Sequence, residues 1–272
     1  MTRPRGEHEA RGVAAGAIAA LAVALLTPLT SEAQTPSGLR ETTYGKRRGF
    51  ESPQHFAVEL RFSPFTPDVD SDPSLHGATP FRDRFGTNPR LLFGAELDWQ
   101  VVRIPHVGTL GPGVGGGYST MSRPAPFAPP RTGTSGEDTS FEVFPFYGVA
   151  VLRVDVLWRD LGVPFVPYAK MGLAYSLWRS SNTLGTSAYT SASSGQRILG
   201  EGHTVGTELA FGLGFNLNAL DPYAARNFDD AMGVNGSYLF AEWTRSDLNG
   251  LFQQNALPVG GTYWTFGLAF EF

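Results

Sequence analysis

The residues of this sequence most suited to chemistry are charged residues at alternate positions of apolar segments. A buried ion is very costly unless it is paired, so charges that share one interior must either form ion pairs or line water. The six acids and three bases predict a salt-bridged plug or, because negative charge is in excess, a narrow cation path. These residues are Glu59, Arg61, Glu96, Asp98, Arg153, Asp155, Lys170, Glu208 and Glu242.

An acidic segment, Asp68-Val-Asp-Ser-Asp72, resembles the start of a calcium-binding loop, in which alternate carboxylates converge on one cation. Pro73 stands where such a loop needs glycine, and Thr79 where it needs a bidentate glutamate. We therefore expect a solvated loop. Contact with a divalent cation or with lipopolysaccharide is the alternative, and no metal site is predicted.

A glycine pattern, Gly111, Gly113 and Gly116, has the spacing of a dinucleotide-binding fingerprint. That fingerprint requires a strand, a tight turn and a helix, and no such unit surrounds these glycines. We interpret them as positions where neighbouring strands approach closely or bulge. No cofactor is predicted.

Histidines and hydroxyl side chains raise the question of a hydrolase. His55, His76, His106 and His203, with the serines and threonines of residues 180–194, include the residue types of a nucleophile and its base. No spacing singles out one set, and a solvated loop histidine explains each of them. We predict no enzyme activity, and keep a lipid-modifying enzyme as the weakest hypothesis.

The segments that must position the charges show a period of two, which is typical of β-strands. The clearest is 262–272, in which large apolar residues alternate with small or polar ones. Its length of about 10 residues suits a tilted strand across a bilayer. Such an ending resembles the signal by which barrel-assembly machinery recognises its clients. The expected signal residues are Trp264, Phe266, Leu268, Phe270 and Phe272.

Seven further segments alternate in the same way, which predicts eight antiparallel strands in a closed transmembrane β-barrel. Long segments rich in Gly, Pro and Ser follow every second strand, as expected for extracellular loops. Asp221, Pro222 and Gly233 have the order of an N-cap, a first helical residue and a helix end, which predicts one short periplasmic helix. The expected strands are 56–63, 93–101, 107–118, 141–158, 168–177, 205–217, 237–244 and 262–272.

The N-terminal residues favour export. Three arginines precede the uncharged run 13–26, and small residues follow around Ala33. This order is typical of a cleaved secretory signal peptide. The expected organisation is a signal peptide at 1–33, a periplasmic lead-in at 34–53 and a barrel at 54–272, in the outer membrane of a Gram-negative bacterium. The chain has no cysteine, so neither disulfides nor a cysteine-linked lipid are expected.

Composition narrows the expected partners. A net charge of -4 gives no reason to expect nucleic acid. Of the residues, 12% are aromatic, and tryptophans and tyrosines near strand ends are typical of interfacial girdles. The expected partners are membrane lipid, lipopolysaccharide and, during biogenesis, the barrel-assembly machinery. The oligomeric state is left open.

Several sequence blocks resemble a family of outer-membrane β-barrel proteins from myxobacteria and their relatives. The resemblance covers 51–272 and implies a small barrel without assigning catalytic residues. The function we expect first is a structural or surface-interaction role of the extracellular loops, and a small cation-preferring pore is the alternative. The blocks are Gly94-Ala-Glu-Leu-Asp-Trp-Gln100, Arg103-Ile-Pro-His106, Gly111-Pro-Gly-Val-Gly115, Val151-Leu-Arg-Val-Asp155, Val166-Pro-Tyr-Ala-Lys170 and Ser246-Asp-Leu-Asn-Gly250.

Overall fold

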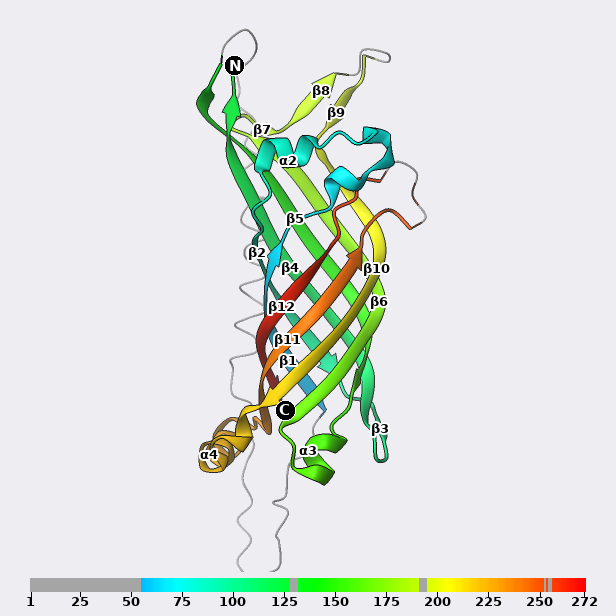
Figure 1. Ribbon diagram of the computed structural model, residues 1–272, viewed down its shortest axis with the longest axis vertical. Coiled ribbons are helices and arrows are strands. Elements are labelled where there is room, and N and C mark those ends of the chain that lie inside the picture. The colour runs from blue at the N-terminus through cyan, green and yellow to red at the C-terminus, as the bar shows by residue number, and fades with distance from the viewer. Residues whose placement is uncertain (1–54, 128–131, 191–194, 252, 254–255) are drawn as a thin grey trace, which may run out of the picture. The chain divides into compact units, whose positions relative to one another are not determined.

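Eight antiparallel strands close into a barrel in the computed structural model, which describes residues 55–127, 132–190, 195–251, 253 and 256–272 (Figure 1). Each strand pairs with two neighbours, and β6 pairs with β10 to complete the circuit. The sequence prediction of an eight-stranded antiparallel barrel is confirmed. The strands are β1 (Phe56–Phe65), β2 (Arg90–Trp99), β4 (Gly108–Pro126), β5 (Thr134–Arg153), β6 (Phe165–Asn182), β10 (Glu201–Asn216), β11 (Gly236–Asp247) and β12 (Gly261–Glu271).

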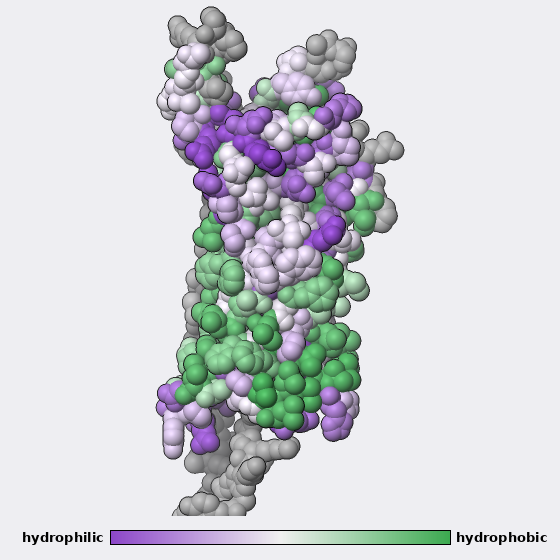
Figure 2. Space-filling view, viewed as in Figure 1, coloured by the Kyte–Doolittle hydropathy of each residue, from purple (hydrophilic) through white to green (hydrophobic). Residues whose placement is uncertain are grey.

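Alternation along each strand separates a lumen from an outer surface. In β1, Glu59 and Arg61 are buried inside, whereas Leu60 and Phe62, which alternate with them, are exposed outside. Successive side chains of a strand face opposite sides, so the same division runs through the neighbouring strands. Figure 2 shows the hydrophobic side chains gathered over the lower half of the visible face and hydrophilic ones over the upper part.

Three strands are longer than the sequence predicts: β4, β5 and β6 have 19, 20 and 18 residues. Most of 119–139, which the sequence predicts as a loop, is paired strand, from Ser119 opposite Val143 to Pro124 opposite Asp138. Most side chains in this stretch are small or polar on both faces of the strand, and Met121 is the large apolar exception. The period of two is therefore lost from the sequence while the strand continues.

One end of the barrel carries short elements inside its connections. The β1–β2 connection contains the 3-10 turns η1 (Val69–Ser71) and η2 (Pro73–Leu75) and the helix α2 (Pro80–Phe85). The β6–β10 connection contains β7 (Gly185–Thr186) and a hairpin of β8 (Ala188–Thr190) with β9 (Arg197–Leu199). The sequence does not predict α2, because six residues are too few to display a helical period.

The opposite end carries β3 (Val102–Ile104), α3 (Val156–Leu161), η3 (Leu217–Ala219) and α4 (Pro222–Met232). The expected helix is confirmed as α4. The Asp221 carboxylate accepts hydrogen bonds from the first backbone N–H groups of α4, and Gly233 ends the helix with a φ of 68°. No helix in the described part of the chain is long and apolar enough to cross a membrane.

Glycines inside the lumen make room for aromatic rings on neighbouring strands. Gly115 pairs with Tyr147, and Gly212 pairs with Tyr168. A Cβ atom added to either glycine would collide with the ring of its partner. An eight-stranded barrel has just enough interior space for its side chains, so each bulky ring needs a small residue opposite it. This packing explains Gly115 of β4, whereas a Cβ atom at Gly111 would collide with the backbone of Trp99. The next strand along the chain is β5, and no helix follows β4 directly as a dinucleotide site would require.

Candidate functional site: the barrel lumen

The centre of the lumen holds Arg61 of β1. Its Nη1 atom lies 2.8 Å from Glu59 Oε2 and 2.7 Å from Glu96 Oε2. Its Nη2 atom pairs with the carboxylate of Glu242 on β11. All four side chains are buried, so each charge depends on its partners and not on bulk water for stabilisation.

Lys170 reaches the same carboxylates from the opposite wall. Its Nζ atom lies 2.8 Å from Glu59 Oε2, 2.8 Å from Glu96 Oε1 and 3.3 Å from Glu242 Oε2. In the order of strands around the barrel, β6 is diametrically opposite β1. Ion pairs therefore span the whole width of the lumen.

A second arginine, Arg153 of β5, extends the cluster toward the α4 end. Its Nη2 atom lies 2.7 Å from Glu59 Oε1 and 2.6 Å from Asp98 Oδ2. Glu59 is thereby shared by all three buried cations. We call the connected residues Glu59, Arg61, Glu96, Asp98, Arg153, Lys170 and Glu242 the lumen charge network.

Glu271 is a buried acid at the edge of this network that the sequence prediction missed. Its carboxylate accepts hydrogen bonds of 2.8 Å from Gln100 Nε2 and 2.8 Å from the Tyr238 hydroxyl. It lies 3.9 Å from Arg153 Nη1. The signal was present in the sequence, because Glu271 alternates with outward aromatic residues of β12.

Eight of the nine predicted lumen residues are buried inside the barrel, and Asp155 is the exception. Strand β5 ends at Arg153, and Asp155 is the N-cap residue of α3. Its Oδ2 atom pairs with Arg103 at 2.8 Å and lies 3.7 Å from Arg159. Partial burial raises the pKa of Asp155, and Arg103 opposes this shift. The prediction was wrong because it extended the strand alternation through a helix.

Glu208 is inside the lumen but apart from the cations. It is only 4% exposed, and no salt bridge to it is found among the described residues. It lines a cavity of about 20 Å³ together with Ser246 and Arg61. That volume is enough for about one water molecule, which can hydrate the carboxylate locally without forming a path.

Three buried carboxylates, Glu59, Glu96 and Asp98, come close enough for their oxygens to share one ion. Oxygen ligands of this type suit calcium or magnesium. Arg61 and Lys170 already contact two of these carboxylates, and their positive groups would repel a metal ion at this place. The donor set does not fit a metal, so we assign the carboxylates to the charge network.

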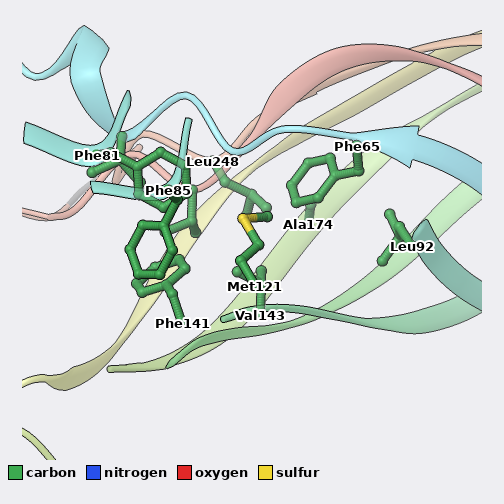
Figure 3. Packing of buried hydrophobic residues seen from close by; sticks show 11 residues of the cluster. Phe65, Phe81, Phe85, Leu92, Met121, Phe141, Val143, Ala174 and Leu248 are labelled. Carbon is green, nitrogen blue, oxygen red and sulfur yellow. The ribbon is translucent and has the colours of Figure 1, made fainter. Parts of the chain in front are cut away.

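The α2 end of the lumen is closed by apolar side chains, which we call the apolar cap. Figure 3 shows Phe81 and Phe85 of α2 against Phe141 of β5, with Met121 and Leu248 nearby. The ring centroids of Phe81 and Phe141 are 5.5 Å apart. The sequence prediction missed this cap. Its members are Phe65, Val69, Phe81, Phe85, Leu92, Met121, Phe141, Val143, Ala174, Leu248 and Val259.

The acidic segment that resembles a calcium loop holds α2 in place. The two carboxylate oxygens of Asp70 accept hydrogen bonds from the backbone N–H groups of Phe81 at 2.8 Å and Arg82 at 2.9 Å. Asp72 accepts a hydrogen bond from the Ser74 N–H, which lowers the pKa of Asp72. The carboxylates of Asp70 and Asp72 therefore organise the backbone of this connection.

The histidines do not form a catalytic group in the described part of the chain. The ring of His203 stacks on Tyr175 on the outer surface, with centroids 5.7 Å apart. His106 Nδ1 lies 3.9 Å from Asp160 in an exposed turn at the other end of the barrel. Among the side-chain hydrogen bonds of the described residues, none joins a histidine to a serine or threonine.

Comparisons with known proteins give only distant likenesses. No family model matches the chain, and no curated protein matches it. The attachment invasion locus protein Ail of Yersinia pestis is 13% identical, with a TM-score of 0.38 over 80% of this chain and 97% of that one. OprG, an outer membrane protein of Pseudomonas aeruginosa, is 12% identical, with a TM-score of 0.45 over 80% and 96%. The outer membrane enzyme PagL is 11% identical, with a TM-score of 0.35 over 79% and 97%.

These scores are too low to transfer a role to this chain. The eight-stranded barrel rests on the strand pairing itself, which closes between β6 and β10. A barrel fold can carry many unrelated functions, so the fold by itself leaves the function open. The resemblance to the myxobacterial family stays a prediction.

Proposed function

We propose that the protein is an outer-membrane β-barrel with a closed lumen, which serves as a structural or surface-binding protein through its loops at the α2 end. The observation that carries this proposal is the double closure of the interior. Ion pairs between β1 and β6 span the lumen, and the apolar cap covers it at the α2 end.

The outer surface supports a membrane location. Met171, Leu173, Phe211 and Leu239 all face outward with half or more of their surface exposed. Soluble proteins rarely expose a contiguous apolar band, whereas a membrane barrel presents one to lipid. The C-terminal residues from Trp264 to Phe272 follow the same pattern, which is compatible with their proposed role as an assembly signal.

The loops at the α2 end are the proposed surface for contact with lipopolysaccharide or another cell surface. The β1–β2 connection at this end, 66–89, is longer than any connection at the opposite end, as expected for an extracellular loop of an outer-membrane barrel. In the β6–β10 connection, Leu184 is 94% exposed and Tyr189 is 63% exposed. Exposed aromatic and aliphatic side chains on a loop are suited to binding, because they lose water when a partner covers them.

A cation-preferring pore is less compatible with this interior. The excess of buried acids would attract cations. A permeating ion would nevertheless have to pass the apolar cap, whose side chains offer no groups to replace its water. We propose no enzyme activity, since no described histidine shares a side-chain hydrogen bond with a serine or threonine.

The loop proposal is tested by removing the β6–β10 connection. Arg179 and Glu201 are paired directly, so replacing 180–200 by Asn-Gly closes a tight hairpin and shortens β6 only by its last three residues, 180–182. We expect the folded protein to shift its gel mobility on heating as before. Binding to immobilised lipopolysaccharide is expected to fall about tenfold, equivalent to ~1.4 kcal/mol.

Point variants provide a matched control for this experiment. Leu184→Ser with Tyr189→Ser removes exposed apolar side chains from the loop, and Leu161→Ser with Tyr223→Ser removes similar ones at the α4 end. Only the first pair is expected to weaken binding. Equal binding by the hairpin variant and the unmodified protein would contradict the proposal.

A further inference from the structure

A cavity of about 410 Å³ lies at the α4 end of the lumen, between the charge network and the segments η3, α3 and α4. This volume falls within the roughly 300–1,000 Å³ range of small-molecule sites. Its walls include Gln100, Thr109, Arg153, Trp158 and Asn216, together with Ala225 of α4. Of these, Thr109, Arg153 and Asn216 are at most 5% exposed. The polar groups of the cavity are therefore built into the barrel wall.

Two amide side chains have a fixed orientation because of their other partners. Gln100 Nε2 donates to the Glu271 carboxylate at 2.8 Å, which leaves Gln100 Oε1 as an acceptor. Asn216 Oδ1 accepts from the Asn218 backbone N–H at 2.9 Å, which leaves Asn216 Nδ2 as a donor. The Gln100 amide thus offers an acceptor and the Asn216 amide a donor. Neither amide can rotate by 180° without losing its existing hydrogen bond.

Two further groups add to this set. Arg153 Nε is buried and has no hydrogen-bond partner in the described part of the chain. The Thr109 hydroxyl, from the neighbouring strand β4, can donate or accept. Leaving a buried donor unpaired is costly, so a ligand oxygen that accepts from Arg153 Nε would relieve an existing penalty.

The charges around the cavity are already compensated. Arg153 pairs with Glu59 and Asp98, and Asp155 pairs with Arg103. The Glu271 carboxylate accepts two hydrogen bonds and lies near Arg153. Arg159, which also lines the cavity, lies 3.7 Å from the same Asp155 carboxylate, so each charged side chain among the described lining residues has an opposite charge within 4 Å. The cavity favours an uncharged molecule that carries several donors and acceptors.

We propose that this cavity binds a small neutral saccharide. Sugar hydroxyls donate and accept hydrogen bonds, which matches the mixed set formed by Gln100, Thr109, Arg153 and Asn216. The indole of Trp158, which also lines the cavity, supplies an apolar surface for the C–H face of a sugar ring. This site goes beyond the proposed role of the loops, and it does not depend on which end of the barrel faces the cell exterior.

Saturation-transfer NMR on the refolded protein would test this site. The protein should be kept in lauryldimethylamine oxide, because a detergent with a sugar headgroup would compete. The probes are maltose, chitobiose and the dipeptide alanyl-alanine. We expect at least one of the two saccharides to bind with saturation in the millimolar range, and the dipeptide not to bind.

Two tryptophan variants on α4 locate the binding. Ala225 lines the cavity, whereas the neighbouring Ala224 is exposed. Ala225→Trp should fill the cavity and abolish saccharide binding, and Ala224→Trp should leave it unchanged. Thr109→Val removes one hydroxyl at nearly constant volume and should weaken binding about threefold to tenfold, as the loss of one hydrogen bond does.

Three outcomes would overturn the proposal. They are no saccharide binding up to tens of millimolar by a folded barrel, unchanged binding by the Ala225→Trp variant, and binding of the dipeptide alone. Heat-dependent gel mobility of each variant shows that the barrel is folded. Absence of saccharide binding at this cavity would leave the loop proposal intact, because the two experiments probe opposite ends of the barrel.

Discussion

Replacing Arg61 by methionine is expected to destabilise the folded barrel by about 3–5 kcal/mol, the usual cost of breaking a buried ion pair by removing one partner. Arg61 contacts Glu59, Glu96 and Glu242, and each of these carboxylates is at most 2% exposed. Methionine keeps the apolar stem of the side chain, so the loss is mainly electrostatic. Urea unfolding in lipid vesicles, followed by heat-dependent gel mobility, measures the effect.

The matched control is Arg245→Met. Arg245 is on β11, is exposed, and pairs only with Asp247 among the described acids. An exposed pair contributes about 0–1 kcal/mol, so this variant should unfold nearly as the unmodified protein does. Adding Glu242→Gln to Arg61→Met should recover part of the lost stability, because it removes one of the uncompensated carboxylates. Similar, small effects of both arginine variants would refute a structural role for the network.

The second large effect is expected from Phe81→Ala combined with Phe85→Ala. Both rings are buried in the apolar cap, and truncating a buried phenylalanine costs about 3–5 kcal/mol. The helix α2 should then detach from the barrel end, while the strands stay paired. Because 3 kcal/mol corresponds to a change of more than about 100-fold in an equilibrium, detached α2 should be readily cleaved.

Limited trypsin digestion measures this opening, since α2 contains Arg82 and Arg84. We expect cleavage at these two sites to be about 100-fold faster in the double variant, in proportion to the open population. Phe127→Ala, which truncates an exposed phenylalanine of the β4–β5 connection, should leave the rate unchanged. Equal cleavage in all three proteins would mean that the cap does not hold α2.

The strands of the barrel were predictable where one face is apolar and exposed outside and the other is polar and buried inside. In β12 the alternation identified the outward residues, and in β1 it placed Glu59 and Arg61 inside. The extensions of β4 and β5 were not predictable, since most of their side chains are small or polar on both faces and show no apolar period. Asp155 was misplaced for the opposite reason, because an alternating pattern continued past the end of its strand into α3.

The ion pairs inside the lumen could not be derived from the sequence. Which carboxylate meets Lys170 depends on strand tilt and register around the whole barrel, and Lys170 and Glu59 lie on opposite walls. The apolar cap was missed because Phe81 and Phe85 belong to a helix of only six residues. A segment that short shows no period, and its burial becomes apparent only when the barrel brings Phe141 beneath it.

The closed lumen is tested most directly by single-channel recording of the refolded protein in a planar bilayer. The charge network and the cap together predict no discrete conductance steps from a barrel shown to be folded by its gel mobility. The Phe81→Ala and Phe85→Ala variant should also be silent, because the ion pairs between β1 and β6 still cross the lumen. Discrete cation-selective steps that change with Glu96→Gln or Asp98→Asn would contradict the account, since they would show that these carboxylates line a water path.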